Sequence, residues 1–252
     1  MKGLRRHPFR VLGRFCWFAV EVTLAILAFG WHCAFRPSLA ERARWLHRAS
    51  RRHLRIFRVT TDVGGLIPLR GLLVCNHLSY LDVLVLSSIT PAVFVAKREI
   101  RGWPLFGPLA SWAGTLFVDR ERRTAVKQVN DAIELLLKQD VLVVLFPEGT
   151  SSDGQTVLPF KSSLLEPAAQ SSHPLFVGLV QYRLEDGDVG EEICYWRDMV
   201  FFPHLINLAS KRSIRAAVRF APADRAGADR KELARQLRSG ILQLKSNFSE
   251  FR

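Results

Sequence analysis

Six short apolar runs, separated by stretches with helical periodicity, constrain the fold of this 252-residue chain more than any other feature. The runs lie at residues 72–76, 92–96, 114–118, 141–146, 174–180 and 214–220, and the helical stretches at 81–88, 104–112, 121–138 and 229–246. Strands that alternate with helices are typical of an α/β domain, because each helix returns the chain to the same edge of a parallel sheet. We therefore predict a mostly parallel sheet flanked by helices, with the site at the strand ends.

The N-terminal part of the chain has a different character. Residues 15–35 contain one acid, Glu21, and one histidine, His32, among 21 residues, which is long enough to cross a hydrocarbon core. Basic residues flank this run on both sides, so the distribution of positive charge does not select one orientation. Two arrangements fit: a helix or helical hairpin seated in one leaflet with both ends on the cytoplasmic face, and a single membrane span.

Residues 39–58 place apolar side chains at helical intervals among many arginines. This pattern is typical of a basic amphipathic helix that lies on an anionic membrane, and we favour that interpretation. The alternative is a helix that packs on the domain and exposes its basic face to solvent. The formal net charge of +13 likewise favours a polyanionic partner, which includes nucleic acid, anionic lipid and phosphorylated substrates.

Several classes of protein lack support in this sequence. The four cysteines are scattered and the seven histidines are dispersed, so we predict no disulfide framework, no metal site and a reducing compartment. We find no zinc-finger spacing, RNP-like aromatic motif or basic zipper, and we expect no nucleic-acid partner. A non-catalytic basic membrane-binding protein would account for the N-terminal part, but not for the polar residues at the strand ends.

One histidine and one aspartate form the candidate catalytic pair. His77 follows the run at 72–76, and four residues separate it from Asp82. A five-residue step along one helix would set two side chains about 140° apart, so His77 must precede the helix that carries Asp82. An aspartate bonded to one ring nitrogen fixes the tautomer and leaves the other nitrogen free as a base. The chain has no G-x-S-x-G nucleophile elbow, so the substrate supplies the hydroxyl.

Charged residues also follow other predicted strands, and one lysine follows a loop beyond them: Lys97, Arg120, Glu148 and Lys161. Together with the candidate pair, they bring one base, two carboxylates and three cations to the ends of neighbouring strands. Each of these residues alone is a weak signal, because strand ends often carry charges to solvent. Their combination predicts a functional site.

Three segments in this order resemble the motif series of the glycerolipid acyltransferase family, which includes the bacterial 1-acylglycerol-3-phosphate O-acyltransferases and lysophospholipid acyltransferases. The segments are NHLSYLD at 76–82, GTLFVDR at 114–120 and FPEGT at 146–150. A weaker likeness covers most of the chain beyond residue 70. The resemblance implies transfer of a fatty acyl group from acyl-CoA or acyl carrier protein, as co-substrate and without a bound cofactor, to the hydroxyl of a lysolipid.

The resemblance also implies roles for individual residues. His77 would be the general base, with Asp82 orienting it. Substrate binding would fall to six further residues: Lys97, Arg120, Glu148, Gly149, Thr150 and Lys161. The two cations at the strand ends would hold a phosphate on the acceptor, and the carboxylate would bind its polar backbone. Backbone N–H groups of residues 148–150 are candidates for stabilising an oxyanion.

The N-terminal pattern and the resemblance together predict the organisation of the chain. Residues 1–60 would form a membrane anchor and residues 61–252 an acyltransferase domain, attached to an anionic membrane at the cytoplasmic face of the inner (plasma) membrane. The third motif usually continues with arginine, where this chain has Ser151, so one phosphate ligand is missing. The distal segment CYWRDMVFFPHL at 194–205 is similar to the subgroup that acylates lyso-ornithine lipid, a phosphate-free acceptor. We rank lysophosphatidic acid, which would give phosphatidic acid in phospholipid biosynthesis, first and lyso-ornithine lipid a close second.

Overall fold

The computed structural model describes residues 7–33, 36–118, 123–225 and 229–247, and side chains outside 31–33 and 123–128. Its centre is one seven-stranded sheet with the order β1-β7-β6-β2-β5-β3-β4. The strands are β1 Val59–Gly65, β2 Gly71–Cys75, β3 Ala92–Lys97, β4 Leu116–Val118, β5 Leu142–Leu145, β6 Leu175–Leu184 and β7 Ile214–Pro222. From β6 to β4 all neighbours are parallel, whereas β7 is antiparallel to β6 and parallel to β1. The predicted mostly parallel sheet is confirmed.

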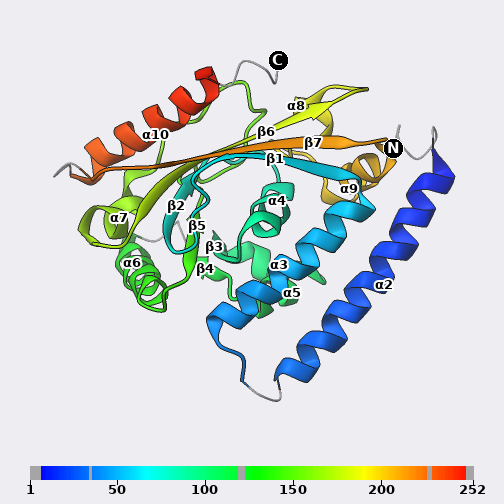
Figure 1. Ribbon diagram of the computed structural model, residues 1–252, viewed down its shortest axis with the longest axis horizontal. Coiled ribbons are helices and arrows are strands. Elements are labelled where there is room, and N and C mark those ends of the chain that lie inside the picture. Colours follow the sequence, from blue (N-terminus) through cyan, green and yellow to red (C-terminus); the bar gives the residue numbers. More distant parts are fainter. Residues whose placement is uncertain (1–6, 34–35, 119–122, 226–228, 248–252) are drawn as a thin grey trace.

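Helices cover both faces of this sheet (Figure 1). One face carries α3 Leu39–Ile56, α4 Leu81–Ile89 and α9 Phe201–Ser210, and the other carries α6 Arg123–Leu137, α7 Glu166–Gln170 and α10 Arg230–Asn247. Strand side chains alternate between the two layers, so that Leu73 and Leu72 of β2 belong to opposite cores. All residues of β2 and β5 are buried, as expected for central strands covered on both faces. The shorter helices are η1 Arg98–Gly102, α5 Phe106–Trp112, η2 Ser162–Leu165 and α8 Val189–Glu192.

The N-terminal helix α2 Pro8–Cys33 packs beside α3 (Figure 1). Its three charged side chains, Arg10, Arg14 and Glu21, contact the rest of the protein. The carboxylate of Glu21 lies 2.7 Å from the guanidinium of Arg52 on α3. The buried guanidinium of Arg14 donates to the carbonyl oxygens of Ala209 and Lys211, at 3.0 and 2.6 Å, at the end of α9. The sole acid of the apolar run therefore serves to fix α2 to its neighbour.

The opposite face of α2 is apolar and uncovered. Six large apolar side chains on it are at least half exposed: Phe9, Leu12, Trp17, Val20, Leu24 and Leu27. The segment Pro8–Gly30 has a mean hydropathy of 1.8, and its length and composition would suffice to cross a membrane. An exposed apolar surface of this kind is costly in water and favours association with lipid.

The structure corrects the interpretation of residues 39–58. Helix α3 begins with a capping box between Ser38 and Glu41, and it buries Leu54 and Ile56 against the domain. The apolar side of α3, which we expected to lie on a membrane, is thus covered by α4 and the sheet and packs in the protein core. The opposite side remains exposed and carries a line of arginines: Arg44, Arg48, Arg51 and Arg55.

Strand β1 and helix α9 were not predicted, and neither were the short helices η1, η2, α7 and α8. Strand β1 escapes the search for apolar runs because only Val59 of its seven residues is buried, as is common on the edge of a sheet. Helix α9 lies where only a family likeness was noted, although it buries Leu205 and Leu208. The four predicted helices and six predicted strands are found with shifts of a few residues at their ends. The division of the chain at residues 60 and 61 stays a prediction.

Candidate active site

The candidate base lies in the loop between β2 and α4, ahead of the helix as the spacing requires. Asn76, just after β2, fixes this loop to β6: its side chain donates to the carbonyl of Val180 at 3.0 Å and accepts from its N–H at 2.8 Å. His77 follows, and its ring stacks on Phe146 at the end of β5 with ring centroids 4.2 Å apart. Residues of three parallel strands, β2, β5 and β6, or directly after them thus hold the loop that carries the imidazole.

The predicted pair is in contact. Nδ1 of His77 lies 2.8 Å from Oδ2 of Asp82, whose side chain is completely buried, while the histidine side chain is 23% exposed. No other group of the described residues bonds to the imidazole, so Nε2 is left without a protein partner. An imidazole oriented through Nδ1 with a free Nε2 is suited to accept a proton from a bound hydroxyl.

Asp82 is held by further donors. The backbone N–H groups of Leu78 and Ser79 donate to Oδ2 at 2.7 and 3.0 Å, and the hydroxyl of Tyr182 on β6 donates to Oδ1 at 2.6 Å. The sequence did not point to Tyr182, because it lies 100 residues from Asp82 and belongs to no recognised motif. Its position in a strand directly beside β2 is the signal that could have drawn attention to it.

Glu148 contacts the loop that carries His77. Its Oε1 accepts from the backbone N–H of His77 at 2.9 Å, and its Oε2 accepts from that of Leu158 at 3.0 Å. Burial raises the pKa of this carboxyl to about 7, against the lowering effect of the two backbone hydrogen bonds. These contacts fix the loop geometry. The expected contact of Glu148 with the acceptor stays a prediction.

In the turn after Glu148, not every N–H group is available to stabilise an oxyanion. Gly149 has a φ of +75° and donates its own N–H to the carbonyl of Phe146 at 3.2 Å, so this group is already used. The N–H of Thr150 has no acceptor among the described residues. A Cβ on Gly149 would lie 2.8 Å from Nζ of Lys161, which shows that the lysine amine lies directly over the turn. Gly149, Thr150 and Lys161 are therefore neighbours.

Of the two predicted phosphate-binding residues, the structure describes Lys97. Lys97 ends β3 with an exposed side chain, and its Cα is in register with that of Val118, the last residue of β4. Arg120 lies outside the described residues. The register supports the expectation that the residues following β4 emerge at the same edge of the sheet as Lys97.

Ser151 has a structural contact where the family pattern has arginine. Its hydroxyl donates to the carbonyl of Tyr195, and the N–H of Tyr195 in turn donates to the carbonyl of Leu78 at 2.8 Å. The N–H of Ser152 donates to the carbonyl of His77 at 3.0 Å. The loop after β5 and the loop after α8 therefore hold His77 and Leu78 in place through their carbonyl oxygens.

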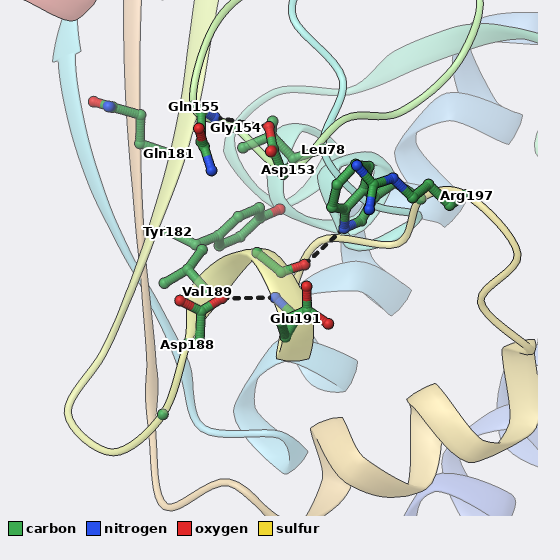
Figure 2. Close-up of a pocket in the computed structure, with 13 residues that line it drawn as sticks. Leu78, Asp153, Gly154, Gln155, Gln181, Tyr182, Asp188, Val189, Glu191 and Arg197 are labelled. Atoms are coloured by element: carbon green, nitrogen blue, oxygen red, sulfur yellow. Dashed lines mark hydrogen bonds between the residues drawn. The ribbon is translucent and has the colours of Figure 1, made fainter.

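A cavity of about 720 Å³ is lined by Leu78 and Tyr182, which contact Asp82, and not by His77 or Asp82 themselves (Figure 2). Leu78 and Tyr182 form its wall toward Asp82, and its charged lining residues are Asp153, Asp188, Glu191 and Arg197. The guanidinium of Arg197 lies 3.8 Å from the centre of the Trp196 ring, in a cation–π contact. The lining holds three carboxylates and one cation, which contrasts with the strongly basic chain as a whole.

The cysteines near the pair are unsuited to act as nucleophiles. Cys75 and Cys194 are fully buried. Burial, reinforced by the charge of Asp82, raises the pKa of the Cys75 thiol well above its ordinary value and that of Cys194 to about 12. Within the described ranges, no group of three or more His, Cys, Asp or Glu side chains could hold a metal ion.

Comparison with known proteins agrees with this geometry. The model of the family described as Acyltransferase matches residues 66–179. Lyso-ornithine lipid O-acyltransferase of Rhizobium meliloti is 38% identical over 70% of this chain and 65% of that protein. The protein of the same name from Brucella abortus is 36% identical over 75% of this chain and 76% of its own length. A 1-acyl-sn-glycerol-3-phosphate acyltransferase of Neisseria gonorrhoeae is 34% identical over 50% of this chain and 53% of that protein.

The matches therefore span less than two thirds of the Rhizobium and Neisseria proteins. The fold is similar to the crystal structure of PlsC, the 1-acyl-sn-glycerophosphate acyltransferase of Thermotoga maritima. The TM-score is 0.66 at 20% identity, and the superposition covers 96% of this chain and 99% of that structure.

Proposed function

We propose a function from one premise, which is that this chain belongs to the acyltransferase family. It transfers a fatty acyl group from a thioester donor, acyl-CoA or acyl carrier protein, to the free hydroxyl of a lysolipid. The observation that carries this proposal is the 2.8 Å contact between His77 Nδ1 and Asp82 Oδ2, with Nε2 left without a partner among the described residues.

The geometry supports direct transfer without an acyl-enzyme. The lysolipid hydroxyl gives its proton to Nε2 of His77 as its oxygen attacks the thioester carbonyl, and Asp82 stabilises the imidazolium that forms. The tetrahedral intermediate then expels the donor thiolate, which takes the proton from Nε2. The free N–H of Thr150 is our candidate for stabilising the oxyanion in between.

Three observations favour lyso-ornithine lipid as the acceptor over lysophosphatidic acid, which the sequence motifs ranked first. The relatives named for lyso-ornithine lipid align over a larger part of this chain than the Neisseria phosphate-lipid relative. Ser151 is committed to the Tyr195 carbonyl and offers no positive charge. The three carboxylates around the cavity would repel a phosphate, whereas an amino-acid headgroup brings an ammonium. Lys97 and Arg120 remain the argument for the phosphorylated acceptor.

A purified full-length protein tests the reaction. Saturating acyl-CoA and acyl carrier protein would each be offered with lysophosphatidic acid, lyso-ornithine lipid and other lysophospholipids, with the His77→Ala variant as the blank. We expect His77-dependent transfer, fastest to lyso-ornithine lipid. If no lysolipid accepts an acyl group while the protein still binds vesicles, the proposal fails and a non-catalytic membrane-binding role takes its place.

We also propose that the enzyme works on the cytoplasmic face of the inner membrane. The uncovered apolar face of α2 supplies lipid-facing area, and the exposed arginines of α3 supply positive charge for anionic headgroups. Both thioester donors are cytoplasmic, so a lysolipid held in the membrane and a donor from solution would meet at His77.

A further inference from the structure

The two carboxylate oxygens of Asp82 accept different numbers of hydrogen bonds. Oδ2 takes three donors, from the His77 ring and the N–H groups of Leu78 and Ser79. Oδ1, within the part of the chain that the structure describes, accepts a hydrogen bond from the Tyr182 hydroxyl alone. Burying a carboxylate costs free energy unless each oxygen accepts a hydrogen bond. The loss of this one donor would leave Oδ1 without a hydrogen bond in its present position.

Tyr182 is itself constrained as a donor. Its side chain is 6% exposed, and burial together with the charge of Asp82 raises the pKa of its phenol well above the ordinary value. The proton therefore stays on the tyrosine throughout the accessible pH range, and the 2.6 Å contact is an O–H···O⁻ bond of the short, charge-assisted kind. Because Tyr182 lies on β6, this bond links the pair to a strand that the catalytic motifs do not include.

We propose that Tyr182 is a positioning residue for the acyl transfer. Its hydroxyl holds Oδ1 so that Oδ2 points at Nδ1 of His77, and its partial positive charge reduces the basicity of the carboxylate that supports the imidazolium. The role rests on the proposed function, since it assumes that His77 is the base. Tyr182 does not touch the reacting atoms and acts through Asp82.

The location of Tyr182 adds a second consequence. Tyr182 lines the cavity of about 720 Å³, with its hydroxyl directed away from the strand toward Leu78 (Figure 2), and the same hydroxyl contacts the buried Asp82. It thereby separates a buried carboxylate from solvent that would compete for its lone pairs. Replacement by phenylalanine keeps this wall and removes only the hydrogen bond.

Several titratable groups near His77 and Asp82 determine which measurement can test the proposal. The pair is faced by Glu148 after β5, Cys75 on β2, Cys194 after α8 and Tyr182 on β6, with Lys161 beyond Gly149. The pKa of Glu148 is raised to about 7 by burial, so a pH profile of activity alone would mix its ionisation with that of the base. The readout must therefore come from the His77 imidazole itself.

The experiment compares Tyr182→Phe with wild type in full-length, histidine-labelled protein in micelles, with the His77 signal identified by its loss in His77→Asn. Without its neutral donor, Asp82 supports the imidazolium more strongly. We expect the titration midpoint of His77 to move to higher pH and its Nδ1 proton resonance to shift. The matched control is Tyr80→Phe, because Tyr80 is a half-buried tyrosine whose hydroxyl bonds to His204, 2.9 Å away, and not to the pair. A merely structural tyrosine would leave both signals in place.

Activity gives an independent measure. The loss of a hydrogen bond to a charged group corresponds to roughly a tenfold to hundredfold effect, and we expect it in kcat, with the KM of the acceptor unchanged. An increase in KM at constant kcat would overturn the proposal, because it would make Tyr182 a substrate contact. An unchanged kcat together with an unchanged His77 titration would overturn it as well.

A further variant guards against misfolding of Tyr182→Phe. The chain has three tyrosines, so the double variant Tyr80→Phe/Tyr195→Phe retains Tyr182 only. Incorporation of fluorotyrosine into this protein makes one hydroxyl more acidic without changing the packing, and we expect the His77 midpoint to fall. No change would count against the coupling. If the midpoint responds while no lysolipid is acylated, Tyr182 positions Asp82 and the proposed function is the part that fails.

Discussion

Glu148 Oε1 accepts a hydrogen bond from the backbone N–H of His77 at 2.9 Å, so a carboxylate at the end of β5 fixes the residue that follows β2. Glu148→Gln retains one oxygen and cannot accept from both His77 and Leu158. One buried N–H then loses its partner, at a cost of about 1–3 kcal/mol in the free energy of unfolding. Chemical unfolding of the detergent-solubilised protein measures this loss. Glu185→Gln, at an exposed position, is the control and should be neutral.

The pH dependence of this contribution has a defined sign. The pKa of Glu148 is about 7 in the folded protein and 4.5 in the reference state, so the native chain binds the extra proton between these values. Stability contributed by Glu148 is therefore fully present below pH 4.5 and lost as the pH rises through 7. The difference in unfolding free energy between wild type and Glu148→Gln should shrink over this window. A difference that stays level from pH 4.5 to 8 would refute the raised pKa.

His77→Asn removes the base and keeps a polar side chain of similar size. We expect kcat to fall by roughly 10²- to 10⁴-fold, with vesicle binding and the circular dichroism spectrum unchanged. His173→Asn serves as the matched control, because His173 precedes β6 at the opposite edge of the sheet. Turnover of His77→Asn at the wild-type rate would exclude the general-base role.

Lys97→Ala and Arg120→Ala test the expected phosphate contacts. If the acceptor carries a phosphate, each substitution should raise its apparent KM about tenfold or more and leave the KM of the acyl donor unchanged. Lys138→Ala, at an exposed site directly after α6, is the control. With lyso-ornithine lipid as the acceptor, the effect should be smaller. An equal rise for donor and acceptor would argue against a headgroup contact.

Trp17→Ser tests the membrane surface of α2. Trp17 is 61% exposed on the apolar face, and we expect its loss to weaken sedimentation with anionic vesicles about tenfold. Leu135→Ser on α6 is matched in exposure, at 61%, and should have no effect. Point substitutions are preferable to deletion of residues 1–58, because α3 contributes Leu54 and Ile56 to the core. Equal loss of binding in both variants would contradict the assignment of this face.

Periodicity predicted the elements that bury apolar side chains on a regular pattern. The strands β2 and β5 are found where four or more apolar residues run together, and α4 where Asp82 had to follow its loop. Edge strand β1 exposes most of its residues and leaves no such pattern. The reversal of β7 relative to β6 is likewise invisible, because the strand sequence is the same whichever way it runs.

The site was predictable as far as its contacts are local. Helix geometry required His77 to precede the helix of Asp82, and the 2.8 Å contact confirms that the two can meet. Tyr182 could not be found in this way, since only the pairing of β6 with β2 brings it near. The backbone contacts of Glu148 were hidden for the same reason: a motif gives the residue type and not the direction in which its side chain turns.

The contact of Arg14 with the end of α9 has a consequence for synthesis. The carbonyl of Ala209 is added 195 residues after Arg14, which at roughly 5–20 residues per second takes about 10 to 40 s. Throughout that time the guanidinium of Arg14 has no α9 to bind, although α3, on which α2 also packs, follows directly in the chain. With the membrane attachment that we propose, α2 would be tethered to a bilayer before the domain that covers its charged side is complete.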